Sequence, residues 1–443
     1  MVEVNSLPAA RVVGALACQQ NSYLRTLKTQ VVSCVKSPPP ASNPKAAKGK
    51  AAAAKPSETS SSEETWMIEC ADSVLFPEGG GQPTDHGSLV ITSGSAPDGI
   101  PIRRAERQGL RCILYSPAPL NPGEEVEQVI DHLRRWNHMQ QHTGQHLLSA
   151  VMDKYDNLKT LGWGMGSDET MNYVDLPRKP TAEEMQSIQS RCNELIRDNL
   201  PITVETPEDA KQDKLPGDYD KSKGIIRVIR IGDMDSNTCC GTHLSQTSHI
   251  SLIILGSTQS VHGKNCRLFF AAGDRAIALA TSSIGAVGSL GKLMSCPSTA
   301  EDVVAKAEKM DEALNDLKRR EKKLVAEIAR FEADKVKATL AEGKNAWVYR
   351  PDGGLDFINA VTFEIKELLK TATGVVVLAS GEEKSSGPVV ILGPNEAVEA
   401  MATTAKDIVT GIKGGGKGGK WQAKVPEWKK EELEALRKAV EGV

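Results

Sequence analysis

Two histidines four residues apart, His142 and His146, stand in the segment HTGQHLLSA. On an α-helix this spacing places both imidazoles on one face, one turn apart, where they can bind the same metal ion. The glutamate of the HExxH motif of metalloproteases is absent, because Thr143 occupies its position. The pair therefore predicts a metal site without the general base that peptide hydrolysis requires.

A second pair of candidate ligands, Cys239 and His243, stands about 100 residues further along, in DSNTCCGTH. Three imidazole nitrogens and one thiolate form a ligand set that suits Zn²⁺, so one Zn²⁺ per chain is predicted. Cys240 is an alternative ligand, but the equal spacing of the two pairs favours Cys239. Asp235 is a candidate for orienting a ligand, and a solvated loop position is the alternative.

The elements that must position these residues belong to a soluble chain of several domains. The 443 residues are 40% hydrophobic and 25% charged, and their net charge of −3 gives no general attraction to nucleic acid. Nine scattered cysteines indicate a reducing compartment and hence a cytoplasmic location. No apolar run approaches the roughly 18–20 residues that span a bilayer, so no membrane partner is expected.

Composition and periodicity divide the chain into four regions. Residues 1–134 contain short β-like runs, interrupted at 37–65 by an insertion rich in Pro, Ala, Lys and Ser that we predict to be disordered. Residues 135–275 mix helices and strands, and the helix after Thr181 has a capping box with Glu184.

The two C-terminal regions are a helical segment and a small domain. Residues 276–342 are helical. The helix over 300–340 repeats its apolar residues at alternating spacings of four and three, interrupted by Glu321, which is typical of a coiled coil or helical hairpin. Residues 343–443 alternate buried strands with a helix and contain the glycine–lysine segment GIKGGGKGGKW, which we predict to be a loop. The fold class is therefore multidomain α+β.

The two metal motifs resemble those of the alanyl-tRNA editing proteins of the AlaX type, in which H-[ST]-x-x-H and C-x-G-T-H carry zinc. Three further segments agree with this resemblance. DSVLFPEGGGQPTDHG (72–87) resembles the glycine-rich motif of their N-terminal β-barrel, and GKNCRLFFAAGDRA (263–276) resembles the strand that closes their editing domain. The end of the chain resembles the C-terminal domain of alanyl-tRNA synthetase. The resemblance covers nearly the whole chain except 37–65.

The resemblance implies a translation-protein-like β-barrel, an α+β zinc editing domain, a coiled-coil-like helix and a C-terminal α/β domain. It implies that His142, His146, Cys239 and His243 bind Zn²⁺, and that the protein hydrolyses mischarged tRNA(Ala) in trans. Ser-tRNA(Ala) is the chief expected substrate, and Gly-tRNA(Ala) is a further candidate. No aminoacylation domain precedes the barrel, so amino acid activation is not expected. One alternative is a non-catalytic tRNA-binding module with structural zinc. Another is a metallopeptidase, although the missing glutamate counts against it.

The expected partners are the acceptor stem and 3′ end of tRNA(Ala), and a second copy of the chain through the helical segment and the C-terminal domain. The glycines of the segment PEGGGQP permit positive φ and close approach of a ligand, so we expect this loop to line the cleft for the acceptor end. A structural turn of the barrel is the alternative. The candidates for the catalytic or substrate pocket are Gly79, Gly80, Gly81, Gln82, Thr143 and Asp235. The candidates for tRNA phosphate contacts are Arg134, Arg135, Lys264, Arg267, Lys413, Lys417 and Lys420.

Overall fold

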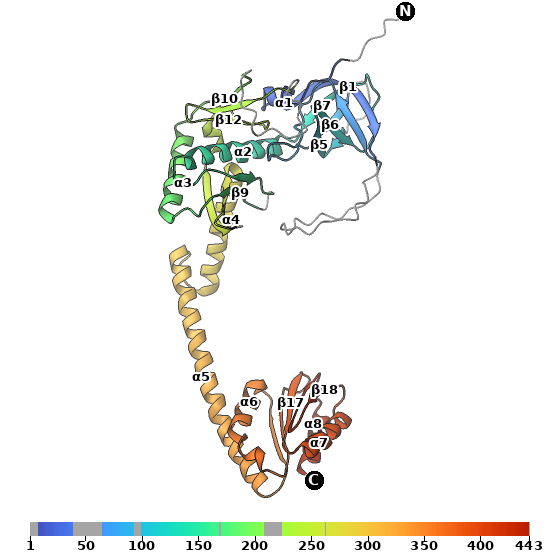
Figure 1. Ribbon diagram of the computed structural model, residues 1–443, viewed down its shortest axis with the longest axis vertical. Helices are drawn as coiled ribbons and strands as arrows, with labels where there is room; N and C mark the ends of the chain where they lie inside the picture. The colour runs from blue at the N-terminus through green and yellow to red at the C-terminus, as the bar shows by residue number, and fades with distance from the viewer. Residues whose placement is uncertain are drawn as a thin grey trace, which may run out of the picture. The chain divides into compact units, whose positions relative to one another are not determined.

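The computed structural model describes residues 8–38, 64–92, 99–167, 170–207, 224–261 and 263–442, so residues 39–63 of the predicted insertion lie outside it. The chain forms two compact units, Met1–Ala286 and Val287–Val443 (Figure 1). The first unit contains both of the regions predicted as separate domains, 1–134 and 135–275.

The N-terminal region of the first unit is a nearly closed, barrel-like antiparallel sheet of seven strands in the order β4-β3-β7-β1-β2-β6-β5. The long first strand joins the two halves of the sheet, because its first half pairs with β7 and its second half with β2, with an irregularity after Val31. Alternate side chains such as Val31, Ile68 and Leu114 fill the interior. The elements are the short helix α1 (Ala17–Gln20) and the strands β1 (Thr26–Lys36), β2 (Trp66–Cys70), β3 (Gly87–Ile91), β4 (Ile100–Ile102), β5 (Arg104–Gln108), β6 (Arg111–Ser116) and β7 (Glu125–Ile130).

The second region of the first unit is built around helix α2 (His132–Met152), which extends from the barrel to α3 (Ala182–Arg197) (Figure 1). The predicted capping box of Thr181 and Glu184 is confirmed at the start of α3. Two antiparallel sheets pack with these helices, in the orders β13-β14-β9-β8 and β10-β11-β12. Their strands are β8 (Gly162–Gly164), β9 (Asn172–Leu176), β10 (Ile202–Glu205), β11 (Val228–Ile231), β12 (Asp235–Thr238), β13 (Ile253–Ser260) and β14 (Cys266–Ala272), and a 3-10 turn, η1 (Thr247–Ile250), precedes β13.

A glycine in α2 allows the helix to lie directly on this sheet. A Cβ atom at Gly144 would be 2.7 Å from the Cβ atom of Ala272 on β14, closer than real Cβ contacts occur. Gln141, on the same helix, donates a hydrogen bond of 2.8 Å to the backbone oxygen of Ala272. The helix that carries HTGQH is therefore held at a fixed height above the sheet.

Two long helices follow, α4 (Gly273–Met294) and α5 (Ala300–Ala341), and α5 confirms the helix predicted over 300–340. By length and composition alone, α4 is apolar enough to cross a membrane. The expectation concerned uninterrupted apolar runs, and α4 does not contain one of that length. Alanine, glycine and serine residues separate the isoleucines and leucines of α4, so its average hydropathy is high although no long uninterrupted apolar run is present.

The C-terminal region is a five-stranded sheet in the order β15-β16-β17-β19-β18, in which β15 and β16 are parallel and the other pairs antiparallel. Alternate residues of β16 face opposite layers, Val376 toward α5 and α6 and Val377 toward α7 and α8, which explains the unbroken apolar run of this strand. The elements are β15 (Ala346–Arg350), α6 (Gly354–Ile365), η2 (Leu368–Lys370), β16 (Val376–Ser380), β17 (Gly387–Leu392), α7 (Asn395–Ile408), β18 (Lys413–Gly416), β19 (Lys420–Val425) and α8 (Lys430–Glu441).

The predicted glycine–lysine loop is largely a β-hairpin. Residues Lys413–Gly416 form β18, which pairs with residues 421–424 of β19, so only residues 417–419 lie between the two strands. Glycine is needed where strands approach closely: a Cβ atom at Gly416 would be 2.1 Å from the backbone oxygen of Lys420. The prediction of a loop was wrong because a glycine-rich strand has no side-chain pattern that distinguishes it from a turn.

Candidate metal centre

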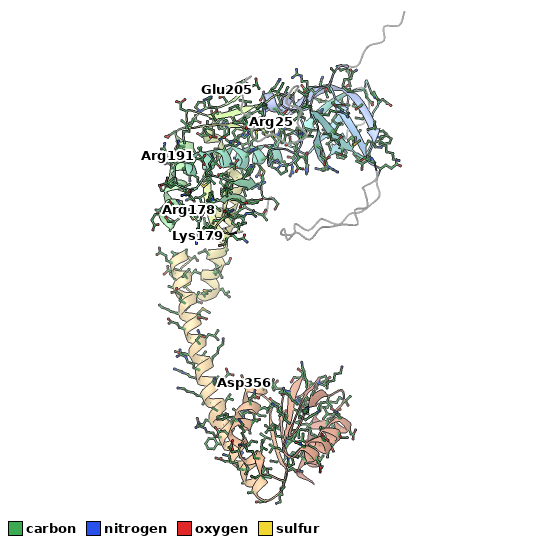
Figure 2. All side chains as sticks on the ribbon, in the orientation of Figure 1. Arg25, Arg178, Lys179, Arg191, Glu205 and Asp356 are labelled. Carbon is green, nitrogen blue, oxygen red and sulfur yellow. The ribbon has the colours of Figure 1, made fainter. Side chains whose placement is uncertain are left out.

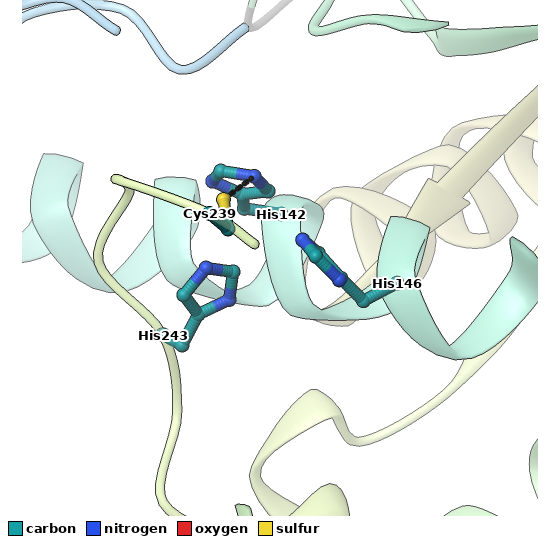
Figure 3. A group of neighbouring side chains, drawn as sticks. All are labelled: His142, His146, Cys239 and His243. Atoms are coloured by element: carbon teal, nitrogen blue, oxygen red, sulfur yellow. Dashed lines mark hydrogen bonds between the residues drawn. The ribbon is translucent and has the colours of Figure 1, made fainter. Parts of the chain in front are cut away.

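Four side chains converge between α2 and the segment that follows β12 (Figure 3). His142 and His146 project from successive turns of α2, and Cys239 and His243 come from the opposite segment. Their ligand atoms all lie within 4.8 Å of one another, and Sγ of Cys239 is 3.3 Å from Nε2 of His142. The three histidines are buried and Cys239 is partly buried. The structure thus brings together the four residues that the sequence motifs selected.

The cluster has the properties expected of residues that hold a cation. His243 is buried, yet neither of its ring nitrogens has a hydrogen-bond partner among the described residues. Burying such polar atoms unpaired costs free energy, and a bound metal ion would remove that cost. Three imidazoles and one thiolate in a tetrahedral set are typical of Zn²⁺. The residues present therefore fit zinc.

The electrostatics of the cluster favour the protonation states that metal ligands require at His243 and Cys239, but not at His146. Burial lowers the pKa of His243 to about 3, assisted by the neighbouring His142, so its imidazole is neutral. Burial raises the pKa of the Cys239 thiol, but His142 and His243 outweigh this effect and hold that pKa well below its ordinary value. Burial also lowers the pKa of His146, whereas Asp235 and Cys239 raise it, to a net value of about 9. A metal ion must therefore displace a proton from His146 when it binds.

Gln82, on the glycine-rich loop of the barrel, sets the orientation of His142. Its Oε1 accepts a hydrogen bond from the backbone N–H of Thr242 at 3.1 Å and lies 2.9 Å from Nδ1 of His142. Since Oε1 is an acceptor, Nδ1 of His142 carries the proton and Nε2 keeps its lone pair for a metal. Gln82 is fully buried and positions His142, and its predicted contact to the tRNA end stays a prediction.

The glycine-rich loop lies directly against the ligands. Gly80 and Gly81 have φ values of 63° and 82° in a turn closed by two hydrogen bonds between Gly79 and Gln82, of 3.1 and 3.0 Å. A Cβ atom at Gly80 would be 3.1 Å from Sγ of Cys240 and 3.6 Å from Sγ of Cys239. The loop is therefore both a structural turn and a wall of the metal centre, and Gly80 and Gly81 are its exposed part.

Two further predicted pocket residues have different surroundings. Thr143 is fully buried, and its Oγ1 accepts a hydrogen bond of 3.1 Å from the backbone N–H of Leu244. It joins α2 to the ligand segment, and its pocket role stays a prediction. The side chain of Asp235 is 11% exposed, and its Oδ2 lies 3.7 Å from Nδ1 of His146. Asp235 therefore borders the metal centre.

Known proteins are similar in sequence to this chain over nearly its full length. Residues 226–269, which include Cys239 and His243, match the family described as the threonyl and alanyl tRNA synthetase second additional domain. The chain is 35% identical to the alanyl-tRNA editing protein alaX of Saccharomyces cerevisiae, over 96% of each chain. The chain belongs to the alanyl-tRNA editing proteins. It is also 33% identical to the alanyl-tRNA editing protein Aarsd1 of Mus musculus, over 95% of this chain and 97% of that protein.

The similarity to a synthetase is weaker and partial. The chain is 28% identical to the alanine–tRNA ligase of Natronomonas pharaonis, over 73% of this chain but only 35% of the ligase. Most of this editing protein is therefore similar to about one third of a synthetase. This agrees with the resemblance to alanyl-tRNA synthetase noted in the sequence.

Three residues at the metal centre of this editing protein were not predicted from the sequence. The ring of Trp163, on β8, lies 4.8 Å from the ring of His142, measured between centroids. Arg227 is buried and donates hydrogen bonds to the backbone oxygens of Gly241 at 2.7 Å and Gln19 at 2.8 Å. Gln19 in turn donates to the backbone oxygen of Cys240 at 2.8 Å. Of these three residues, only Arg227 had a signal in the sequence, because it is a charged residue within the apolar run IIRVIRI.

The basic residues predicted to contact tRNA differ in accessibility. Arg135 is fully buried and forms an ion pair with the buried Asp85, so its guanidinium is already engaged within the protein. Arg134 is partly exposed and donates to the backbone oxygen of Thr84 at 3.1 Å. Arg267 is paired with Asp175 at 2.8 Å. The remaining candidates are exposed: Lys264, Lys413, Lys417 and Lys420.

Proposed function

We propose that this editing protein is a zinc-dependent hydrolase that deacylates mischarged tRNA(Ala) in trans, chiefly Ser-tRNA(Ala), with Gly-tRNA(Ala) as a second substrate. The observation that carries the proposal is the cluster of three buried imidazoles and one thiolate, in which both nitrogens of His243 have no hydrogen-bond partner among the described residues. The relatives named as alanyl-tRNA editing proteins support the substrate class.

His142, His146, Cys239 and His243 would hold the zinc ion, which when bound supplies a Lewis acid for an ester carbonyl or lowers the pKa of water. Gln82 holds the imidazole of His142 in one tautomer, and Arg227 holds the backbone on either side of Cys240. The aminoacyl ester has a ribose hydroxyl as its leaving group and needs less activation than a peptide. This chemistry agrees with the absence of a glutamate at Thr143.

Selectivity for serine over alanine requires polar groups positioned to form hydrogen bonds with the serine hydroxyl. A site built to hydrogen-bond a hydroxyl group leaves its own groups unpaired when alanine enters, which is a strong basis for rejection. The exposed Gly80 and Gly81 and the partly exposed Trp163 border the centre, so we place the entry of the acceptor end there.

Exposed lysines and arginines supply the phosphate contacts in this proposal. Lys413, Lys417 and Lys420 are exposed along one hairpin, whose glycines allow backbone N–H groups to approach phosphate. In the first unit the exposed candidates include Lys264, and Arg25, Lys179 and Arg191 are further basic side chains at its surface (Figure 2). tRNA(Ala) is the proposed partner, and the cytoplasm, where translation takes place, is the proposed location.

A second copy of the chain is the proposed partner of α5. Its apolar residues Met310, Leu314 and Leu317 are 50%, 48% and 61% exposed, and Leu324 continues the same 4, 3 spacing at 58% exposure. Pairing of two such seams would bury these side chains in a coiled coil. Sedimentation analysis of the full chain tests this: a dimer that dissociates on Leu314→Glu and Leu317→Glu substitution supports it, and a monomeric wild type contradicts it.

The decisive experiment measures the release of amino acid from Ser-tRNA(Ala), Gly-tRNA(Ala) and Ala-tRNA(Ala) by zinc-loaded protein. We expect rapid loss of serine, slower or comparable loss of glycine, and alanine retained at close to the spontaneous rate. If folded, metallated protein binds tRNA(Ala) but releases none of the three, the hydrolase is excluded and a binding module with structural zinc takes its place.

A further inference from the structure

A buried carboxylate oxygen of Asp235 faces the imidazole of His146 at ion-pair distance but receives no hydrogen bond from the described residues. Oδ1 of Asp235, on β12, accepts a hydrogen bond from the side chain of Asn237. Its Oδ2 is buried and has no hydrogen-bond partner among the described residues. An ionised oxygen that is desolvated without a donor is destabilising, so a donor is expected to reach this atom when the protein works.

No group among the described residues donates a hydrogen bond to this oxygen. The imidazole of His146 is adjacent, but its Nδ1 lies 3.7 Å from Oδ2 of Asp235, which is beyond hydrogen-bonding distance. Asp235 therefore does not orient His146 in the way that a carboxylate usually orients a metal-bound histidine. The free oxygen borders the four ligands and is available to a group on a bound substrate.

We propose that Asp235 binds the α-ammonium group of the aminoacyl ester, an inference that rests on the proposed function. Every aminoacyl ester carries this group on the carbon next to the reacting carbonyl, about 2.5 Å from the carbonyl carbon given standard bond lengths and angles. A carboxylate that holds the ammonium group beside His146 thus places the ester carbon next to the metal ligands.

Charge balance supports the same assignment. A divalent cation with three neutral imidazoles and one thiolate retains a net positive charge and repels a cationic substrate group. A carboxylate between them offsets that repulsion. The contact also restricts the substrate class, because an ester without an α-ammonium group leaves Asp235 unpaired. The structure assigns to Asp235 the recognition of α-amino acids, independent of their side chains.

The test pairs one substitution with one change of the substrate. Nitrous acid converts Ser-tRNA(Ala) to glyceryl-tRNA(Ala), in which a hydroxyl group replaces the α-ammonium group, and each enzymatic rate is divided by the spontaneous rate. Asp235→Asn keeps the shape of the side chain and removes its charge, and Asp233→Asn, at an exposed carboxylate two residues earlier, is the matched control. Zinc content is measured for every variant.

Wild type is expected to prefer Ser-tRNA(Ala) over glyceryl-tRNA(Ala) by about 10- to 150-fold, the range for hydrogen bonds to charged groups. Asp235→Asn should lose that factor on Ser-tRNA(Ala) alone, and Asp233→Asn should behave as wild type. Equal losses on both substrates would overturn the inference and assign Asp235 to positioning His146. Unchanged rates on both substrates would overturn it as well.

A binding measurement separates this inference from the proposed hydrolase. The probes are 3′-(L-seryl)amino-3′-deoxyadenosine, which has an amide in place of the ester, and its α-hydroxy counterpart. Calorimetry should show that wild type prefers the ammonium-bearing probe and that Asp235→Asn does not. If wild type hydrolyses neither tRNA but shows this preference, only the hydrolase fails. If it hydrolyses Ser-tRNA(Ala) without the preference, only the role of Asp235 fails.

Discussion

The metal centre and the glycine–lysine hairpin hold their functional side chains in opposite ways. At the metal centre the histidines are buried and anchored from several segments, as Gln82 of the barrel anchors His142. Lys413 and Lys417 of the hairpin are exposed and make no ion pair within the part of the chain that the structure describes. The first arrangement fixes atoms for one geometry, and the second supplies charge that many geometries can use. Substitutions should therefore have large, specific effects at the centre and small, additive effects on the hairpin.

The largest effect is expected for Cys239→Ala, which removes the thiolate ligand. The loss should exceed the roughly 100-fold that loss of an outer-shell partner can cause, in both zinc affinity and deacylation of Ser-tRNA(Ala). Metal analysis after dialysis and single-turnover deacylation measure it. Cys240→Ala is the matched control and should keep its zinc, because the Cys240 thiol faces the glycine loop. Retention of zinc by Cys239→Ala with loss in Cys240→Ala would reverse the ligand assignment.

Arg135→Met should reduce stability strongly, because it leaves the carboxylate of Asp85 buried without its partner. Removing one member of a buried ion pair costs about 3–5 kcal/mol of unfolding free energy, to be measured by urea denaturation. Arg134→Met, at the partly exposed neighbour, should change stability by less than about 1 kcal/mol. The distinction between buried and exposed basic residues fails if the two variants unfold at the same urea concentration.

Gln82→Ala should weaken zinc binding about 10- to 100-fold, the usual cost of losing a group that orients a metal-bound histidine. The barrel fold should persist, as checked by circular dichroism, and competition with a chelator reports the affinity. Gln82→Glu retains an acceptor for Nδ1 of His142 and should bind zinc more tightly than Gln82→Ala. Equal zinc affinity in wild type and Gln82→Ala would show that the barrel contributes nothing to the centre.

The smallest effects are expected on the hairpin. Replacing Lys413, Lys417 and Lys420 by Ala should weaken tRNA(Ala) binding and lower the salt dependence of log K by about 2 to 3, at roughly 0.7–0.9 per lost phosphate contact. Filter binding across a range of salt concentrations measures this slope. Hydrolysis of seryl-adenosine, which lacks the tRNA body, should be unchanged. An unchanged slope would remove the hairpin from the tRNA-binding surface.

Local pattern was sufficient for much of the fold. The capping box at Thr181 and the helix over 300–340 follow from contacts within one or two helical turns, and both are present. The strand Lys413–Gly416 could not be predicted, because glycines lack side chains whose alternation marks a strand. The apolar character of α4, which lies in the segment predicted to be helical from residue 276, was not noticed because small residues separate its larger apolar side chains.

The sequence by itself determined the candidate ligands, since histidine and cysteine spacing on a helix and in a turn points to His142, His146, Cys239 and His243, with Cys240 as the alternative thiol, before any fold is known. Tertiary structure decided what surrounds them. Gln82 meets His142 across 60 residues of chain, and Arg135 meets Asp85 across 50. Such partners leave no periodic signal, because their proximity arises only when the barrel and α2 pack together. The same packing buries Arg135, which the sequence presents as one of two adjacent surface arginines.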